Sequence, residues 1–344
     1  MRQVSLALVG FGNVGQAFVR LLQNKERQLA EQFGMQFMVT GIVTGRHGSA
    51  ISSGGINLNR ALETIHRGQS LDILSEMPAS KNTLEFLFSS SAEAMIESSP
   101  VNHHTGQPAI DHIKAALNKG MHAITANKGP VVHAYRELNE MAAMRGKRFL
   151  FESAVMDGAP IFSLFRGPLP CIQVEGFEGI LNSCTNFILG LMESGKDFDQ
   201  AVREAQSIGI AETDPSADID GWDAAIKVAA LSTVLFGIPL VPQQVERSGI
   251  REITPQMIAE AQQAGERWKL VCAARRRGKE LIEASVAPRR VSAGSPLFAI
   301  NGTSSYIEFK SDVLPGLGIV ENNPGPDTTA YGMLADLLNA LRGQ

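Results

Sequence analysis

A strand and a helix joined by a glycine turn at the N-terminus constrain the fold of this chain most strongly. Residues 4–10, VSLALVG, are mostly aliphatic and end at glycine, as in a short buried strand. The segment GFGNVGQAFVRLL follows, with glycines at 10, 12 and 15 and then apolar residues at helical spacing. This order is typical of a dinucleotide-binding fold, in which the pyrophosphate lies at the helix N-terminus. The candidate cofactor-binding residues are Gly10, Phe11, Gly12, Asn13, Val14 and Gly15.

The second predicted strand, QFMVTGIVTG, indicates which nucleotide is bound. An NAD site usually ends this strand with an acid that hydrogen-bonds the ribose hydroxyls. Here no Asp or Glu occurs between Glu31 and Glu63, and the strand ends at TGRHG. We therefore expect NADP, with its 2′-phosphate at Thr44 and Arg46, and we keep NAD as the alternative. The alternative interpretation of Arg46 is an exposed loop arginine without a ligand.

Alternating strands and helices continue to about residue 150. They predict an α/β fold with a Rossmann-type, doubly wound parallel sheet. Ligands of such sheets bind beyond the carboxyl ends of the strands. Because the predicted strands 91–98 and 121–126 end near Ser99-Pro100 and at Asn127-Lys128, we expect Ser99, Pro100 and Lys128 to contact the cofactor or substrate. A surface role for Lys128 is the alternative.

The pattern changes after residue 150. Helical segments at 183–195 and 197–209 are followed by alternating segments such as ELIEASVAPRRV and SSYIEFKSDV. These features predict a second, α+β domain for substrate binding and dimerisation. We expect a dinucleotide-binding domain at 1–150, a substrate domain at 151–325, and a C-terminal helix at 326–344 that returns to the first domain.

Residues 211–227, AETDPSADIDGWDAAIK, place five carboxylates before one lysine at the head of an apolar run. Asp223 and Lys227 are four residues apart, so they share a helix face. As an exposed pair they would contribute only about 0.3–0.5 kcal/mol. The small apolar neighbours instead predict a packed helix, where desolvation and nearby acids shift the pKa of Lys227 in opposite directions. Such a lysine suits proton exchange with a substrate hydroxyl during hydride transfer, and the carboxylates suit a substrate ammonium group.

Composition excludes several other classes of protein. A net charge of −4 argues against a dedicated nucleic-acid binder. The three separated cysteines indicate neither a disulfide framework nor a zinc site. The N-terminus lacks the pattern of a signal peptide, and no uninterrupted apolar run reaches membrane-spanning length. We expect a cytoplasmic protein that acts on a small molecule.

Several motifs resemble those of homoserine dehydrogenase, in the short form that lacks a C-terminal regulatory domain. They run nearly end to end: GFGNVG, TGQPAIDHIKAALNKGMHAITANKGPV, GILNSCTNFIL, AETDPSADIDGWDAAIK and TTAYGMLADLL. The resemblance implies reversible, NADP-dependent oxidation of L-homoserine to L-aspartate 4-semialdehyde. It also implies a homodimer formed through the substrate domain.

The resemblance also implies roles for individual residues. Lys227 would be the catalytic acid–base group and Lys128 the second active-site lysine. Glu212 would bind the substrate amino group, with Asp218 and Asp223 shaping the site. The segment FESAVMDGAP resembles a loop that binds Na⁺ or K⁺. Its ligands would be Glu152 and the carbonyl groups of Val155, Asp157 and Ala159.

Three segments depart from the family pattern. Where the family usually has Asn-Gly-Thr, this chain has Asn182-Ser183-Cys184. The loop after ESAV, which usually carries glycines, begins here with Met156-Asp157. The usual C-terminal loop GPGAG is replaced by ENNPG at 321–325. All three segments are expected near the nicotinamide and the substrate, so they favour the alternative of a different small hydroxy acid. A non-catalytic NADP(H)-binding protein is a further alternative, against which both lysines and the acid cluster argue.

Overall fold

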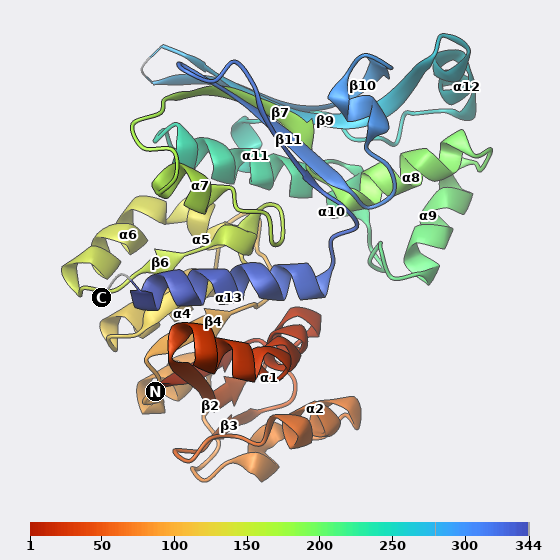
Figure 1. Ribbon diagram of the computed structural model, residues 1–344. Coiled ribbons are helices and arrows are strands. Elements are labelled where there is room, and N and C mark those ends of the chain that lie inside the picture. Colours follow the sequence, from red (N-terminus) through yellow and green to blue (C-terminus); the bar gives the residue numbers. More distant parts are fainter. Residues whose placement is uncertain (279, 343–344) are drawn as a thin grey trace. The chain divides into compact units, whose positions relative to one another are not determined.

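The computed structural model describes residues 1–278 and 280–342, which divide into two compact units (Figure 1). The first unit combines residues 1–160 with the C-terminal segment from residue 325, and the second comprises residues 161–324. The predicted C-terminal helix extends to residue 344, but residues 343 and 344 lie outside the described residues. No helix in the described part of the chain is long and apolar enough to cross a membrane.

The described residues of the first unit form a six-stranded sheet with the order β3-β2-β1-β4-β5-β6. The strands β1, β2, β4, β5 and β6 pair in parallel, as the alternating sequence pattern predicts. Their bounds are β1 Arg2–Val9, β2 Met35–Val43, β3 Ser49–Ile51, β4 Ala94–Glu97, β5 His122–Thr125 and β6 Phe149–Leu150.

Strand β3 was not expected from the sequence. The segment 48–80 reads as loop and helix, but Ser49–Ile51 adds an antiparallel edge to β2. The segment also forms a helix, α2, Leu58–His66, and a 3₁₀ turn, η1, Leu71–Leu74. A three-residue strand carries too little periodicity to be recognised without its partner.

Helices cover both faces of the first sheet. Chain crossovers leave β1 and β4 in opposite directions along the sheet, so right-handed connections put α1 and α4 on opposite faces. The C-terminal helix α13 packs against α1, and α4 packs against α3 and α6. The bounds are α1 Asn13–Phe33, α3 Thr83–Ser89, α4 Ala109–Asn118, α5 Lys128–His133, α6 Tyr135–Met144, η2 Glu152–Ala154 and α13 Pro326–Arg342.

The core between α1, α13 and the sheet is built from fully buried apolar side chains. Phe18 of α1, Leu8 of β1, Ile96 of β4 and Leu337 of α13 belong to one cluster and are at most 1% exposed. This cluster fixes the glycine turn after β1, because strand and helix are both anchored in it.

The second unit contains a sheet with the order β12-β11-β7-β9-β10-β8, in which all pairs except the parallel β10–β8 pair are antiparallel. Helix α11 packs against β9 and β10, and α8 packs against β9. The strands are β7 Val174–Ile180, β8 Glu246–Arg247, β9 Glu266–Arg277, β10 Leu281–Ser292, β11 Ser305–Ser311 and β12 Leu317–Glu321. The helices are α7 Phe162–Arg166, α8 Ser183–Glu193, α9 Phe198–Ser207, α10 Ser216–Ile219, α11 Trp222–Leu235 and α12 Pro255–Gln263, with 3₁₀ turns η3 Pro242–Gln244 and η4 Pro296–Ala299.

Candidate active site

The glycine turn of the first unit has the geometry of a phosphate-binding loop. Gly10 has φ +93°, and a Cβ atom there would lie 2.7 Å from the carbonyl oxygen of Ser98. A Cβ atom at Gly15 would lie 2.6 Å from the carbonyl oxygen of Gly10. Gly12 caps α1 and is exposed, and the first turn of α1 contains no acidic residue. The free amides at this helix end can therefore approach an anion.

The loop after β2 presents Arg46 to solvent. Thr44 Oγ1 accepts a hydrogen bond from the backbone N–H of His47 at 2.7 Å and donates one to the carbonyl oxygen of Gly48 at 3.3 Å. These bonds close the loop and leave Arg46 exposed at its tip. Because the Thr44 hydroxyl serves the loop itself, Arg46 is the residue better placed to receive a phosphate group.

Asn127 joins the loops that follow β4 and β5. Its Nδ2 atom donates to the carbonyl oxygens of Ser99 at 3.2 Å and Pro100 at 3.4 Å. Its Oδ1 atom accepts from the N–H of Gly129 at 2.9 Å, which caps the helix that begins with Lys128. The structure therefore brings Ser99, Pro100 and Lys128 to one edge of the first sheet.

The loop 152–159 is tightly packed within the first unit. Glu152 is 3% exposed, and its N–H donates to Asp336 Oδ2 of α13 at 2.6 Å. The Asp157 carboxylate accepts a hydrogen bond from the Thr329 hydroxyl of α13. Met156 is buried and Asp157 is half-buried, so the Met156 side chain is packed inside this unit.

In the second unit, the Asp223 carboxylate lies beside Lys227 and is itself held by Asn182. Lys227 Nζ lies 3.2 Å from Asp223 Oδ2 and donates to the carbonyl oxygen of Leu181 at 2.6 Å. Asn182 Nδ2 donates to Asp223 Oδ2 at 3.0 Å and to Asp218 Oδ1 at 2.7 Å. The structure thus brings together Asp218, Asp223 and Lys227, which the sequence singles out.

The Asp223–Lys227 pair is not an exposed surface pair. The two side chains are 17% and 14% exposed, and α11 is buried along most of its length. A partly desolvated ion pair is less screened by solvent than a surface pair, so its geometry has more influence on chemistry.

Buried thiols lie beside this cluster. Burial raises the pKa of Cys272 to about 12. Burial also raises the pKa of Cys184, and the neighbouring Asp218 carboxylate raises it further. Both side chains are therefore thiols at neutral pH and unsuited to nucleophilic catalysis.

Glu212 has a different environment from the other predicted acids. It is exposed, and Gln206 Nε2 donates to its carbonyl oxygen at 3.2 Å and to that of Thr213 at 3.1 Å. These bonds hold the loop through its backbone, and the Glu212 side chain faces solvent.

Sequence reasoning missed buried polar residues that hold helix α8 in place. Asn182 lies in a triplet noted only as a departure, and its bonds to residues 36 and 41 positions away have no local signal. Lys269, only 1% exposed, donates to Asn186 Oδ1 at 2.8 Å and to the carbonyl oxygen of Ile300 at 2.5 Å. Burial lowers the pKa of Lys269 to about 8.

Comparisons with known proteins identify the family. The model of the homoserine dehydrogenase family matches residues 160–338. A homoserine dehydrogenase of Methanocaldococcus jannaschii is 33% identical, with 98% of each chain covered. The chain belongs to the homoserine dehydrogenase family. A relative named NAD(+)-dependent homoserine dehydrogenase, from Pseudomonas canavaninivorans, is 32% identical over 98% of this chain and 96% of its own length.

Solved homoserine dehydrogenases share the fold. A hyperthermophilic archaeal homoserine dehydrogenase in complex with NADPH has a TM-score of 0.84 at 28% identity, covering 100% of this chain and 99% of its own. The enzyme from Thiobacillus denitrificans has a TM-score of 0.83 at 27% identity, covering 99% of this chain and 74% of its own. The predicted family and the Rossmann-type fold class are confirmed.

Proposed function

We propose that this homoserine dehydrogenase family member catalyses the reversible, NADP-dependent oxidation of L-homoserine to L-aspartate 4-semialdehyde. The cluster of Lys227, Asp223, Asn182 and Asp218 is the observation that carries the proposal. It combines a partly buried proton-exchanging group with carboxylates that suit an amino-acid ammonium.

In this proposal Lys227 exchanges the proton of the substrate hydroxyl group. The Leu181 carbonyl and the Asp223 carboxylate hold its Nζ atom in place. Asp218, Asp223 and Glu212 bind or orient the amino group, and Lys128 acts as the second active-site lysine. The nicotinamide dinucleotide, when bound, accepts the hydride in the oxidative direction.

The first test is NADP⁺ reduction with L-homoserine at alkaline pH by wild type and Lys227→Ala. We expect the variant to lose at least about a hundredfold in kcat while still binding NADPH. Lys196→Ala is the matched control, because Lys196 pairs with Glu204 on α9 at the surface. Absence of turnover by a wild-type protein that binds NADPH would reject L-homoserine as substrate.

A different small hydroxy acid is the second candidate substrate. Asn323, in the segment ENNPG, has φ +48°, and its N–H donates to Ser304 Oγ at 3.3 Å. A side chain therefore occupies a position where the family has a glycine-rich loop. A panel of hydroxy acids, assayed with the same two variants, separates this substrate change from a non-catalytic NADP(H)-binding role, in which no compound is turned over.

NADP is the proposed cofactor, with NAD as the alternative. The exposed Arg46, at the tip of the loop that Thr44 closes, supports binding of a 2′-phosphate. One relative is named NAD(+)-dependent, and the solved structure of another is a complex with NADPH. The ratio of kcat/KM for NADP⁺ and NAD⁺ decides between them.

We also propose a monovalent-cation site at Glu152, Val155, Asp157 and Ala159. The buried Glu152 carboxylate and the turn closed by the Ala159 N–H and the Met156 carbonyl oxygen, 2.7 Å apart, fit such a site. Na⁺ or K⁺ there would stabilise the loop electrostatically. A rise in thermal stability with KCl or NaCl, but not with choline chloride at equal ionic strength, is expected.

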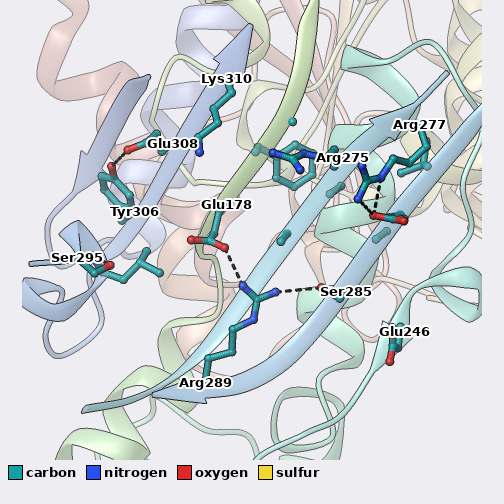
Figure 2. Close-up of a pocket in the computed structure, with 18 of the residues that line it drawn as sticks. Glu178, Glu246, Arg275, Arg277, Ser285, Arg289, Ser295, Tyr306, Glu308 and Lys310 are labelled. Atoms are coloured by element: carbon teal, nitrogen blue, oxygen red, sulfur yellow. Dashed lines mark hydrogen bonds and ion pairs between the residues drawn. The ribbon is translucent and has the colours of Figure 1, made fainter. Parts of the chain in front are cut away.

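A homodimer through the second unit is a further part of the proposal. A hollow of about 680 Å³ is lined by residues of β7, β9, β10 and β11. Acidic and basic side chains are interspersed along it (Figure 2). Glu178 lies opposite Glu308 in the sheet register and pairs with Arg289 at 2.8 Å. Such a mixed surface suits a second copy related by two-fold symmetry. Light scattering should give twice the chain mass, and Arg289→Glu should reduce it.

A cytoplasmic location completes the proposal. Free cysteines at 171, 184 and 272 are consistent with a reducing compartment. Fractionation of the source cells, with the protein followed by antibody, tests this location.

A further inference from the structure

Two carboxylates of the proposed substrate site are joined by a short turn. Asp218 belongs to α10 and Asp223 to the first turn of α11, and residues 219–222 connect them. Both carboxylates accept a hydrogen bond from the same side-chain nitrogen, Asn182 Nδ2, at 2.7 and 3.0 Å. Because two like charges that converge on one donor repel each other, their spacing depends on how firmly the turn is held.

Arg247 lies along this turn and contacts three consecutive residues of it. Its aliphatic stem lies beside Gly221, where a Cβ atom would be 3.3 Å from Arg247 Cγ. Its guanidinium carbon is 3.8 Å from the centre of the Trp222 ring, and its Nη1 atom donates to the carbonyl oxygen of Asp220. Gly221 has φ +80°, a conformation that favours glycine, so the turn leaves this side open to the arginine.

The backbone of Arg247 is itself anchored to the sheet of the second unit. The residue belongs to β8 and pairs with Val286 of β10. The N–H of Ser248 donates to the carbonyl oxygen of Val286 at 2.8 Å, and the N–H of Ile250 donates to that of Ile219 at 2.9 Å. This segment therefore links the sheet to the turn, and the Arg247 side chain reaches the turn from a fixed position.

A second arginine at the same turn has a different environment. Arg251 pairs with the Asp220 carboxylate, and its Nη2 atom lies 3.2 Å from Asp220 Oδ2. The Arg251 side chain is 52% exposed, whereas Arg247 is half-buried. An exposed ion pair of this kind is screened by solvent and contributes little to the position of the turn.

The contacts of Arg247 require a guanidinium group. An apolar side chain would fill the space beside Gly221 but would not hold the carbonyl oxygen of Asp220. A lysine would donate to that oxygen, but it lacks the planar group that stacks on Trp222 while it donates. The arginine combines packing of its stem, stacking on the ring and a charge-assisted hydrogen bond.

We propose that Arg247 is a positioning residue of the substrate site. By holding the turn 219–222, it keeps the carboxylates of Asp218 and Asp223 at the spacing that receives the ammonium group of the substrate. Its positive charge alone would have the opposite effect on binding, because it would repel an ammonium group. The inference rests on the proposed function, since it requires an amino-acid substrate at these carboxylates.

The test compares KM and kcat for L-homoserine, at saturating NADP⁺, between wild type and Arg247→Met. The methionine keeps part of the stem but removes the charge, the stacking group and the donor. We expect KM for L-homoserine to rise about tenfold, on the scale of a lost charge-assisted hydrogen bond. We expect kcat to change less than about threefold, because the Leu181 carbonyl oxygen holds Lys227 independently of the turn.

Arg251→Met is the matched control. It removes an arginine from the same turn but leaves the bond from Arg247 to the carbonyl oxygen of Asp220 intact. We expect it to change KM for L-homoserine less than about twofold. A fall in KM in both variants would show that the two arginines act only through their charge, which would overturn the positioning role.

The remaining outcomes separate the inference from the proposed function. An unchanged KM in Arg247→Met would overturn the positioning role, and so would a loss of kcat without a change in KM. A wild-type protein that binds NADPH but does not turn over L-homoserine would overturn the proposed function, and the inference with it. If circular dichroism shows that Arg247→Met is unfolded, Arg247→Lys replaces it. That variant is expected to raise KM at least about threefold, and a wild-type KM would contradict the proposal.

Discussion

Lys227 Nζ lies 3.2 Å from Asp223 Oδ2, which belongs to the preceding turn of α11. The same oxygen accepts a hydrogen bond from Asn182 Nδ2 at 3.0 Å. One carboxylate oxygen therefore links the proposed acid–base group to the residue that caps α8. Any change at Asp223 alters both the charge beside Lys227 and the anchoring of α8.

Replacement of Asp223 by asparagine should impair catalysis more than folding. The amide keeps the size of the side chain but removes the negative charge beside Lys227. We expect kcat/KM for the hydroxy-acid substrate to fall by about a hundredfold or more, with a small change in thermal unfolding. The control is Asp220→Asn, because Asp220 pairs with Arg251 nearer the surface. Equal activity of the two variants would show that Asp223 has no role in the reaction.

Replacement of Arg46 by alanine should change cofactor preference. A guanidinium that binds the 2′-phosphate contributes to the binding of NADP but not of NAD. We expect KM for NADP⁺ to rise about ten- to a hundredfold and KM for NAD⁺ to change less than about twofold. Initial-rate measurements with both cofactors check this. If the KM values for NADP⁺ and NAD⁺ change by the same factor, Arg46 does not bind the 2′-phosphate.

Gly332 is required by the close approach of α13 to the loop 152–159. A Cβ atom at Gly332 would lie 2.5 Å from the carbonyl oxygen of Asp157 and would also contact Ser153 Oγ. Because one of these atoms is backbone, Gly332→Ala should destabilise the protein by about 1–3 kcal/mol. Urea unfolding followed by circular dichroism measures this.

Gly190 of α8 is the matched control for that substitution. A Cβ atom at Gly190 would meet nothing within 4 Å. Gly190→Ala should therefore be neutral or stabilising by up to about 1 kcal/mol, as expected for glycine in a helix interior. Similar destabilisation by both substitutions would show that steric contact at Gly332 is not the cause.

His122 should make the protein less stable in mild acid. Burial, together with the nearby positive charges of Lys147 and Arg2, lowers the pKa of His122 to about 4. Its Nδ1 atom accepts the N–H of Arg148 at 3.1 Å, as only a neutral imidazole can. In the unfolded chain the pKa is about 6.5. Between these values the unfolded state binds the extra proton, so stability falls as the pH decreases.

The variant His122→Asn isolates this contribution, because its Oδ1 atom can accept the same hydrogen bond without titrating. Between pH 7 and pH 5 the wild type should lose about 2 kcal/mol more unfolding free energy than the variant. Parallel stability curves for the two proteins would show that His122 does not titrate as its environment indicates.

The sequence alone predicted the features whose residue pattern lies within one short segment. The glycine turn and α1 follow from local spacing, because strand, turn and helix are consecutive and each has its own periodicity. The pairing of Asp223 with Lys227 follows in the same way from a four-residue separation on one helix. Motifs of this kind also identified the family.

Only the tertiary structure determined which distant residues contact these motifs. Asn182 meets Asp218 and Asp223 across 36 and 41 residues, and Glu97 meets Thr125 across 28 residues. The antiparallel edge strand β3 likewise depends on β2. Buried polar groups must find hydrogen bonds, and which groups meet is set by the packing of distant elements. Local spacing therefore determined the candidate residues of this protein, whereas long-range packing determined which of them share a site.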